Sequence, residues 1–269
     1  MIQVKKFLKL YQDPKLLIIF LLGIVSGLPL AMVGSNFSIW LTEAGISRST
    51  IGFMSLVFMP YSLRFIWSPL LDTVKLPNFL GFNVDNRCRW MIALIIATAG
   101  FIFMASQLDL KADIAVAAIL MIAITSCSAT LDSAIDGYRI SITPDDQQAA
   151  AAAMATTGYR GGMLISGGGG LAMAEYYGWA LTYKAVASLM LASILVVLIA
   201  SKCCKVMADK IEESKQSSFS ELLRIKLIEP IKALIKVDSV WLILIFIAIF
   251  RLGDSFLHTM NSPLLIELG

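Results

Sequence analysis

Long apolar stretches separated by short polar segments run along the whole chain of 269 residues. A hydrocarbon core about 30 Å thick needs roughly 20 helical residues to cross it, and seven stretches reach or approach that length. We therefore predict an all-α fold, a polytopic bundle of transmembrane helices. The predicted spans lie near residues 16–41, 49–71, 90–108, 114–137, 149–175, 180–201 and 239–262.

The order of these stretches predicts a domain plan. Six spans, a basic loop and a further span are the arrangement of a two-lobed secondary transporter. We expect a six-helix N-terminal lobe over 1–201, a cytoplasmic loop over 202–238, and the first span of a truncated C-terminal lobe over 239–269. Within the loop, residues 221–236 alternate basic and apolar positions. This pattern predicts a helix lying on the inner leaflet, with binding of a partner protein as the alternative.

Composition and charge support a membrane protein and set its orientation. Hydrophobic residues make up 58% of the chain and charged residues 15%, against about 25% charged in soluble domains. Lysine and arginine are concentrated before the first span, between the second and third, and in the basic loop, whereas the outer loops carry only Arg48, Lys111 and Lys184. The positive-inside rule then places the N-terminus in the cytoplasm. The net charge of +3 reflects this topology and does not indicate nucleic-acid binding.

Neither metal chemistry nor enzymatic chemistry is indicated. The four cysteines are scattered without a CxxC spacing, and His258 is the single histidine, so neither a disulfide framework nor a zinc site is supported. The sequence contains no serine–histidine pairing of the kind that would indicate a hydrolase. The run Leu16–Leu41 is too long for a typical signal-peptide core, which predicts an uncleaved first span. We expect no enzyme activity and no cofactor other than a proton gradient.

Charged residues within the fourth span are the strongest functional signal. Asp132, Asp136 and Arg139 follow an apolar run at spacings of four and three residues, which place them on one helical face. An ionisable side chain at the bilayer centre costs about 2.5–3.5 kcal/mol on insertion scales. Two carboxylates beside a guanidinium can hold one proton in an environment-dependent way. We predict proton coupling or gating, with a static ion network at the span end as the alternative.

The fifth span carries a second signal, Tyr159 followed by Arg160, with apolar sequence on both sides. A mid-membrane arginine faces protein or a water-filled cavity, and a guanidinium suits carboxylates and phosphates. We predict a contact to an anionic substrate, with a salt bridge to a neighbouring helix as the alternative. The glycines of this span predict close helix packing. They are Gly161, Gly162, Gly167, Gly168, Gly169 and Gly170.

Prolines and aromatic residues mark further positions. Pro29 and Pro60 predict kinks in the first two spans, where freed carbonyls often line a cavity. Trp40, near the outer end of the first span, is most simply an interfacial residue, with carbohydrate stacking as the alternative. In the seventh span, Asp254 lies between Arg251 and His258 at helical spacing.

Six segments together resemble the AmpG family of muropeptide permeases, within the major facilitator superfamily. They are GIVSGLPL at 23–30, TIGF at 50–53, FIWSPLLD at 65–72, DSAIDGYR at 132–139, GYRGGMLISGG at 158–168 and LGDSF at 252–256. The resemblance implies a bacterial inner-membrane importer of anhydromuropeptides, products of cell-wall recycling, driven by protons. Their carboxylates suit the arginines of this chain.

The resemblance also implies roles for residues. Asp132 and Asp136 would be coupling or gating acids, together with Arg139. Tyr159 and Arg160 would line the substrate cavity, in which we also place Trp40 and Asp254. Asp72, Arg87 and Arg89 would form the cytoplasmic gate.

The chain departs from the family pattern in three places. The gate segment reads Asp72-Thr73 and then Asn86-Arg87-Cys88-Arg89, with a longer insert, and the loop at 144–149 reads PDDQQA. The family also has about twice as many spans. The alternative function is therefore a truncated or degenerate membrane protein that does not transport and at most assembles with a second half. The expected partners are the lipid bilayer, a small anionic sugar-peptide and such a C-terminal half.

Overall fold

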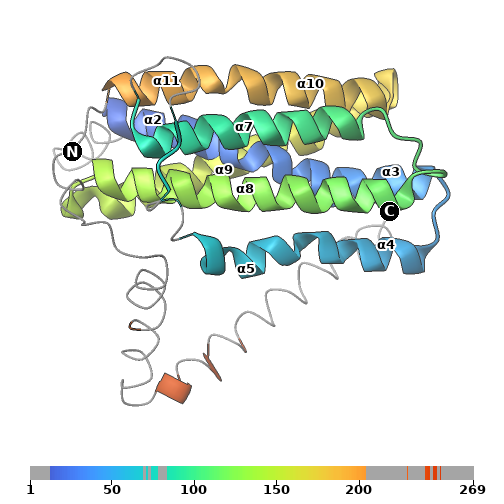
Figure 1. The fold of residues 1–269 in the computed structure, drawn as a ribbon, viewed down its shortest axis with the longest axis horizontal. Helices are drawn as coiled ribbons and strands as arrows, with labels where there is room; N and C mark the ends of the chain where they lie inside the picture. Colours follow the sequence, from blue (N-terminus) through green and yellow to red (C-terminus); the bar gives the residue numbers. More distant parts are fainter. Residues whose placement is uncertain are drawn as a thin grey trace, which may run out of the picture. The chain divides into compact units, whose positions relative to one another are not determined.

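The computed structural model describes residues 13–68, 71, 74–77, 84–203, 229, 240–242, 245–246 and 249. The chain divides into two compact units, Met1–Lys215 and Gln216–Gly269, and each is considered by itself. Throughout the described residues the regular structure is helical, which confirms the predicted all-α class (Figure 1). The boundary between the units lies inside the predicted loop, and the seventh predicted span is largely outside the described residues.

Six helical rods of the first unit correspond to the first six predicted spans. The first rod consists of α2 (Pro14–Ala31), η1 (Met32–Asn36) and α3 (Phe37–Glu43), and the second of α4 (Arg48–Met54), η2 (Ser55–Phe58) and α5 (Met59–Trp67). The third to sixth are α7 (Asn86–Ala105), α8 (Ile114–Ile142), α9 (Gln148–Tyr177, after the short η3 at Asp145–Gln147), and α10 (Trp179–Ala192) with α11 (Ile194–Cys203). Successive rods run between the two ends of the bundle (Figure 1).

Within the described residues, five rods are long and apolar enough to cross a membrane. They are Pro14–Glu43, Arg48–Trp67, Asn86–Ala105, Ile114–Ile142 and Trp179–Lys202. The rod α9, which is the fifth in chain order, has 30 residues and is long enough to cross a membrane. It is absent from this group because its many glycines, its threonines and Arg160 make it less apolar than the other rods. Packing explains part of this composition, as shown below.

Local sequence signals set the ends of the rods. The Asp13 side chain accepts a hydrogen bond from the backbone nitrogen of Lys15 at 2.9 Å and so caps α2. Ser47 caps α4 in the same way, by accepting from the backbone nitrogen of Thr50. Gly178 has a φ of 79°, a left-handed conformation that favours glycine, and it separates α9 from α10.

Local changes of helix type lie near the two prolines at which kinks are predicted. Pro29 lies near the end of α2, which continues into the π-helical η1, and Pro60 follows the 3₁₀-helical η2. The Tyr183 hydroxyl donates to a carbonyl of η1 at 3.0 Å, and Thr125 Oγ1 donates to a carbonyl of η2 at 2.6 Å. At these two points main-chain oxygens of the irregular turns are bonded to side chains of neighbouring helices. That carbonyls freed by the two prolines line a cavity stays a prediction.

The rods α2 and α9 touch backbone against backbone. Gly23 and Gly27 on α2 face Gly158 and Gly162 on α9, and the spacing of four residues is the same on both helices. A Cβ atom on Gly27 would lie 2.1 Å from a carbonyl oxygen of α9, and one on Gly162 would lie 2.2 Å from a carbonyl oxygen of α2. Small residues at this spacing allow transmembrane helices to approach closely. The predicted close packing is confirmed at Gly162.

The other glycines of α9 divide by face. A Cβ atom on Gly167 or Gly170 would lie 3.2 or 2.6 Å from side chains of the first rod. One on Gly161 would make an ordinary contact at 3.9 Å, and Gly168 and Gly169 have nothing within 4 Å of such an atom. Close packing therefore explains only the glycines that face the first rod.

Candidate functional site

Asp132 of α8 lies where three rods meet. Its side chain is 11% exposed. One carboxylate oxygen accepts a hydrogen bond from Ser26 Oγ of α2 at 2.6 Å, and the other lies 4.0 Å from Arg64 Nη1 of α5. A carboxylate enclosed among transmembrane helices is stabilised only when it is paired or hydrogen-bonded. Asp132 meets this requirement with partners from the first and second rods.

The charged group predicted along α8 divides into two. Arg139 Nη2 donates to Asp136 Oδ1 at 3.5 Å, and this pair lies within a single helix. The Asp136 side chain is 49% exposed and that of Arg139 is 16% exposed. The alternative of a static ion network, which was considered for Asp132, Asp136 and Arg139 together, therefore applies to Asp136 and Arg139. Asp132 is directed instead to α2 and α5, because both offer polar partners at its level.

Tyr159 and Arg160 lie between the two contact glycines of α9, Gly158 and Gly162. Tyr159 is half-buried, and its backbone lies against Gly27 of α2. Arg160 is exposed and forms no ion pair with the described residues. The alternative of a salt bridge to a neighbouring helix is thus not realised within the described part of the chain.

The exposed surface of α9 differs from that of the other rods. Its exposed stripe carries the small or polar residues Ala153, Thr157 and Gly168 and the charged Arg160, together with one large apolar residue, Leu164, which is 73% exposed. On the other rods, exposed positions hold large apolar residues, among them Phe53, Leu56, Phe103, Ile119, Leu189 and Leu195. Lipid tails favour large apolar side chains and disfavour a charge. The stripe of α9 suits contact with water or with protein.

Trp40 lies in an aromatic cluster at the far end of the first rod. Its ring stacks on Trp179 with the centroids 6.0 Å apart, and Tyr183 lies 5.0 Å away. Trp179 Nε1 donates to the Glu43 carboxylate at 2.6 Å. These contacts place Trp40 against α10, and the structure does not bring it together with Asp132.

The segment between the second and third rods is fastened by side chains of α7. Arg87 donates to the carbonyl of Gly137 on α8, and Arg89 Nη1 donates to the carbonyl of Leu76 at 2.5 Å. Asn86 accepts from the backbone nitrogen of Leu76 at 2.9 Å. The predicted gate arginines therefore hold main-chain oxygens at the same end of the bundle. Asp72 lies outside the described residues.

Sequence patterns missed the partners of Asp132. Ser26 is a single hydroxyl within an apolar run, and Arg64 is a single charge within the second predicted span. Helical spacing relates residues of one helix and does not indicate which neighbouring helix they meet. Asp254, Arg251 and His258 lie outside the described residues. Among the described residues, histidine, cysteine, aspartate and glutamate form no group of three that would hold a metal ion.

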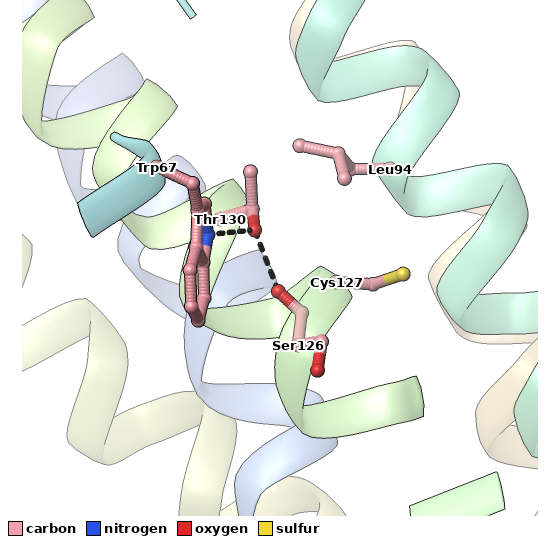
Figure 2. A pocket seen from close by; sticks show the side chains of 5 residues that line it. All are labelled: Trp67, Leu94, Ser126, Cys127 and Thr130. Atoms are coloured by element: carbon pink, nitrogen blue, oxygen red, sulfur yellow. Dashed lines mark hydrogen bonds between the residues drawn. The ribbon is translucent and has the colours of Figure 1, made fainter. Parts of the chain in front are cut away.

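A pocket of about 310 Å³ opens between α5, α7 and α8 (Figure 2). It is lined by Trp67, Leu94, Ser126, Cys127 and Thr130. Figure 2 shows the Trp67 indole nitrogen directed to Thr130 Oγ1, which it reaches at 3.0 Å, and Thr130 in turn bonded to the Ser126 carbonyl. The pocket contains none of the predicted charged site residues.

Comparison with known proteins identifies the family to which the chain is similar. A family model described as Major Facilitator Superfamily matches residues 19–269. "Anhydromuropeptide permease" of Escherichia coli (strain K12) is 32% identical over 97% of this chain and 50% of its own length. A protein of Rickettsia felis provisionally named transporter AmpG 4 is 34% identical over 97% of this chain and 62% of its own length. The chain thus spans about half the length of the first of these relatives, and the resemblance drawn from the motifs is confirmed.

Proposed function

Because this chain belongs to the Major Facilitator Superfamily, we propose that it forms the first lobe of a proton-coupled importer of anhydromuropeptides in the bacterial inner membrane. The name of its Escherichia coli relative supports the transport of such a substrate, and the name of its Rickettsia felis relative supports transport. The N-terminus lies in the cytoplasm in this proposal, as the distribution of lysine and arginine predicts.

The observation that carries the proposal is the enclosure of Asp132. A carboxylate that is 11% exposed, held by Ser26 and Arg64 from two other rods, is retained inside a membrane bundle against a free-energy penalty. Its charge changes when it binds a proton, and that change alters the attraction between rods. A single group of this kind suffices to link proton binding to helix position.

Arg160 is the proposed contact for the substrate. It is exposed on the surface stripe of α9, where small residues and Leu164 flank it, and its guanidinium can bind a carboxylate through two hydrogen bonds. Tyr159, one residue before it, adds a hydroxyl and an aromatic face. Trp40 is engaged by the aromatic cluster and is left out of the proposed cavity, and Asp254 stays a prediction from the sequence.

A second lobe is the proposed partner. In two-lobed transporters the substrate site lies at the interface between the halves. The stripe of α9, which suits water or protein, is the surface such a lobe would cover. The alternative, a membrane protein that does not transport by itself, rests on the chain spanning about half of its relative's length.

Uptake of radiolabelled anhydromuropeptide tests the proposal. The chain is expressed in a transporter-null bacterium together with a second lobe from the Escherichia coli relative. We expect accumulation that a protonophore abolishes, that Asp132→Asn removes and that Arg160→Ala strongly reduces. Asp146→Asn, at an exposed position of η3, is the matched control. Unchanged uptake by Asp132→Asn would refute the role of Asp132, and uptake by the chain without a second lobe would refute the need for a partner.

A further inference from the structure

The second rod is held to the bundle by polar contacts more than by buried apolar surface. In the apolar 18-residue stretch of Arg48–Trp67, only 11% is buried, whereas the corresponding share for Pro14–Glu43 is 72%. Large apolar side chains of this rod face outward, including Leu56 at 62% exposed and Phe65 at 54%. In Figure 1, α4 and α5 lie along one side of the bundle beside α8, the rod on which α5 principally packs.

Hydrogen bonds join the second rod to α8 along most of its length. Thr125 donates to the η2 carbonyl, Tyr61 and Ser128 share a hydrogen bond of 2.7 Å, and Ser68 Oγ donates to Ser133 Oγ at 2.9 Å. The bond from Trp67 to Thr130, drawn in Figure 2, belongs to the same series. We call this series, together with the Arg64–Asp132 contact, the polar seam.

The Arg64–Asp132 contact is the charged member of the polar seam. It lies between the bonds of Tyr61 and Ser68, so it is placed within the series and not at its end. The other members join neutral groups, and their strength does not change with a proton. Asp132 also accepts from Ser26, so it remains attached to α2 whatever Arg64 does.

We propose that Arg64 is a positioning residue that holds the second rod on α8 through Asp132, and that a proton on Asp132 releases this hold. The proton adds to a carboxylate oxygen and removes the charge that attracts the guanidinium. Arg64 is 40% exposed and keeps its own charge when the attraction to Asp132 is lost. The second rod then depends on the neutral bonds alone. The source of the proton in this inference rests on the proposed function. The Arg64–Asp132 contact is independent of that function.

Other titratable groups lie near Asp132. Tyr61 of α5 and Tyr159 of α9 are close enough to interact with its charge, and Asp136 lies one turn further along α8. The tyrosine hydroxyls are neutral at physiological pH, and Asp136 is paired with Arg139. Arg64 is thus the cation nearest to the Asp132 carboxylate among the described residues.

Disulfide formation tests the position of the rod without any need for transport. Ser68 and Ser133 are chosen for replacement by cysteine because their hydroxyl oxygens lie 2.9 Å apart. The native cysteines of this chain are first changed to alanine. At one fixed pH, Asp132→Asn imitates the protonated state. We expect Asp132→Asn and Arg64→Gln to slow cross-linking by roughly twofold to fivefold, the effect of losing one partly exposed charged contact. Arg64→Lys is expected to keep most of the parent rate.

Two further variants sharpen the experiment. Asp136→Asn removes a carboxylate one turn away that pairs within its own helix, and it is expected to leave the cross-linking rate at the parent value. The double variant Arg64→Gln with Asp132→Asn is expected to be no slower than either single variant, because both remove the same contact. Equal cross-linking by all variants would overturn the proposal, whatever the uptake assay shows.

A pH profile of uptake separates positioning from a merely structural role. In the two-lobed protein, Arg64→Gln is expected to move the pH at which uptake declines upward by about one unit, because an adjacent cation favours the ionised carboxylate. Arg64→Lys is expected to restore the parent profile. A uniform loss of uptake at every pH would contradict the positioning role. If no variant or parent transports, the proposed function fails, and the cross-linking result still decides the contact.

Discussion

Replacement of Gly162 by alanine is expected to destabilise the bundle, although alanine is the better helix former. The added Cβ atom would lie 2.2 Å from the carbonyl oxygen of Ile24 and 3.1 Å from the Cα atom of Gly27. Carbon and oxygen atoms of packed groups normally lie about 3.5 Å apart or more, so α2 and α9 must separate by roughly 1 Å. Backbone atoms cannot turn aside as a flexible side chain can.

The magnitude follows from comparing two identical substitutions on one helix. Gly168 lies on the same helix with nothing within 4 Å of an added Cβ atom. Both substitutions gain about 0.5–1 kcal/mol from helix propensity, so this gain cancels in the comparison. Overpacking costs typically about 1–3 kcal/mol. Gly162→Ala is therefore expected to be about 1–3 kcal/mol less stable than Gly168→Ala, which itself is at least as stable as the parent.

Unfolding of the purified chain in mixed micelles with increasing dodecyl sulfate measures this difference, with circular dichroism and tryptophan fluorescence as probes. Adding Gly27→Ala to Gly162→Ala is expected to cost less than Gly27→Ala alone, because the helices have already moved apart. Equal midpoints for Gly162→Ala and Gly168→Ala would refute the direct backbone contact between α2 and α9.

Three further outcomes are expected. Asn36 is fully buried and its Nδ2 donates to a carbonyl of α9 at 2.8 Å, so Asn36→Ala is expected to cost about 1–3 kcal/mol in the same unfolding assay. Tyr183→Phe removes the donor to η1 and is expected to cost about 1 kcal/mol, whereas Tyr176→Phe, at a residue 79% exposed, is expected to change nothing. With the two cysteines after residue 202 replaced by serine, a maleimide is expected to label Cys127, which lines the pocket, well before the buried Cys88; mass spectrometry showing equal labelling would contradict the packing around Cys88.

The position of the rods was largely predictable from apolar length. The predicted span near 114–137 is found as Ile114–Ile142, and capping by Asp13 and Ser47 follows from residue types that favour such positions. The two prolines lie close to the irregular turns η1 and η2. Hydropathy described α9 less well, since its glycines serve a contact with α2 on one face and Arg160 lies on the exposed stripe of the other.

The candidate site was predictable only in part. A charge inside an apolar stretch is conspicuous in a sequence, so Asp132 and Arg160 were found at once. Their surroundings were not, because spacing along α8 suggested that Asp132 shares its environment with Asp136 and Arg139. The structure assigns Asp136 to Arg139 and gives Asp132 to other helices. Residues one turn apart on a helix differ in environment when the neighbouring helix covers only one of them.

The sequence by itself determined that this is a helical membrane protein with charges inside its spans, because apolar length and the penalty for a buried charge act on each segment separately. Only the tertiary structure decided that Ser26 and Arg64 are the partners of Asp132, and that Gly23 and Gly162 belong to one contact. The physical reason is that helical periodicity fixes which residues share a face of one helix, whereas the meeting of two faces depends on how whole helices pack.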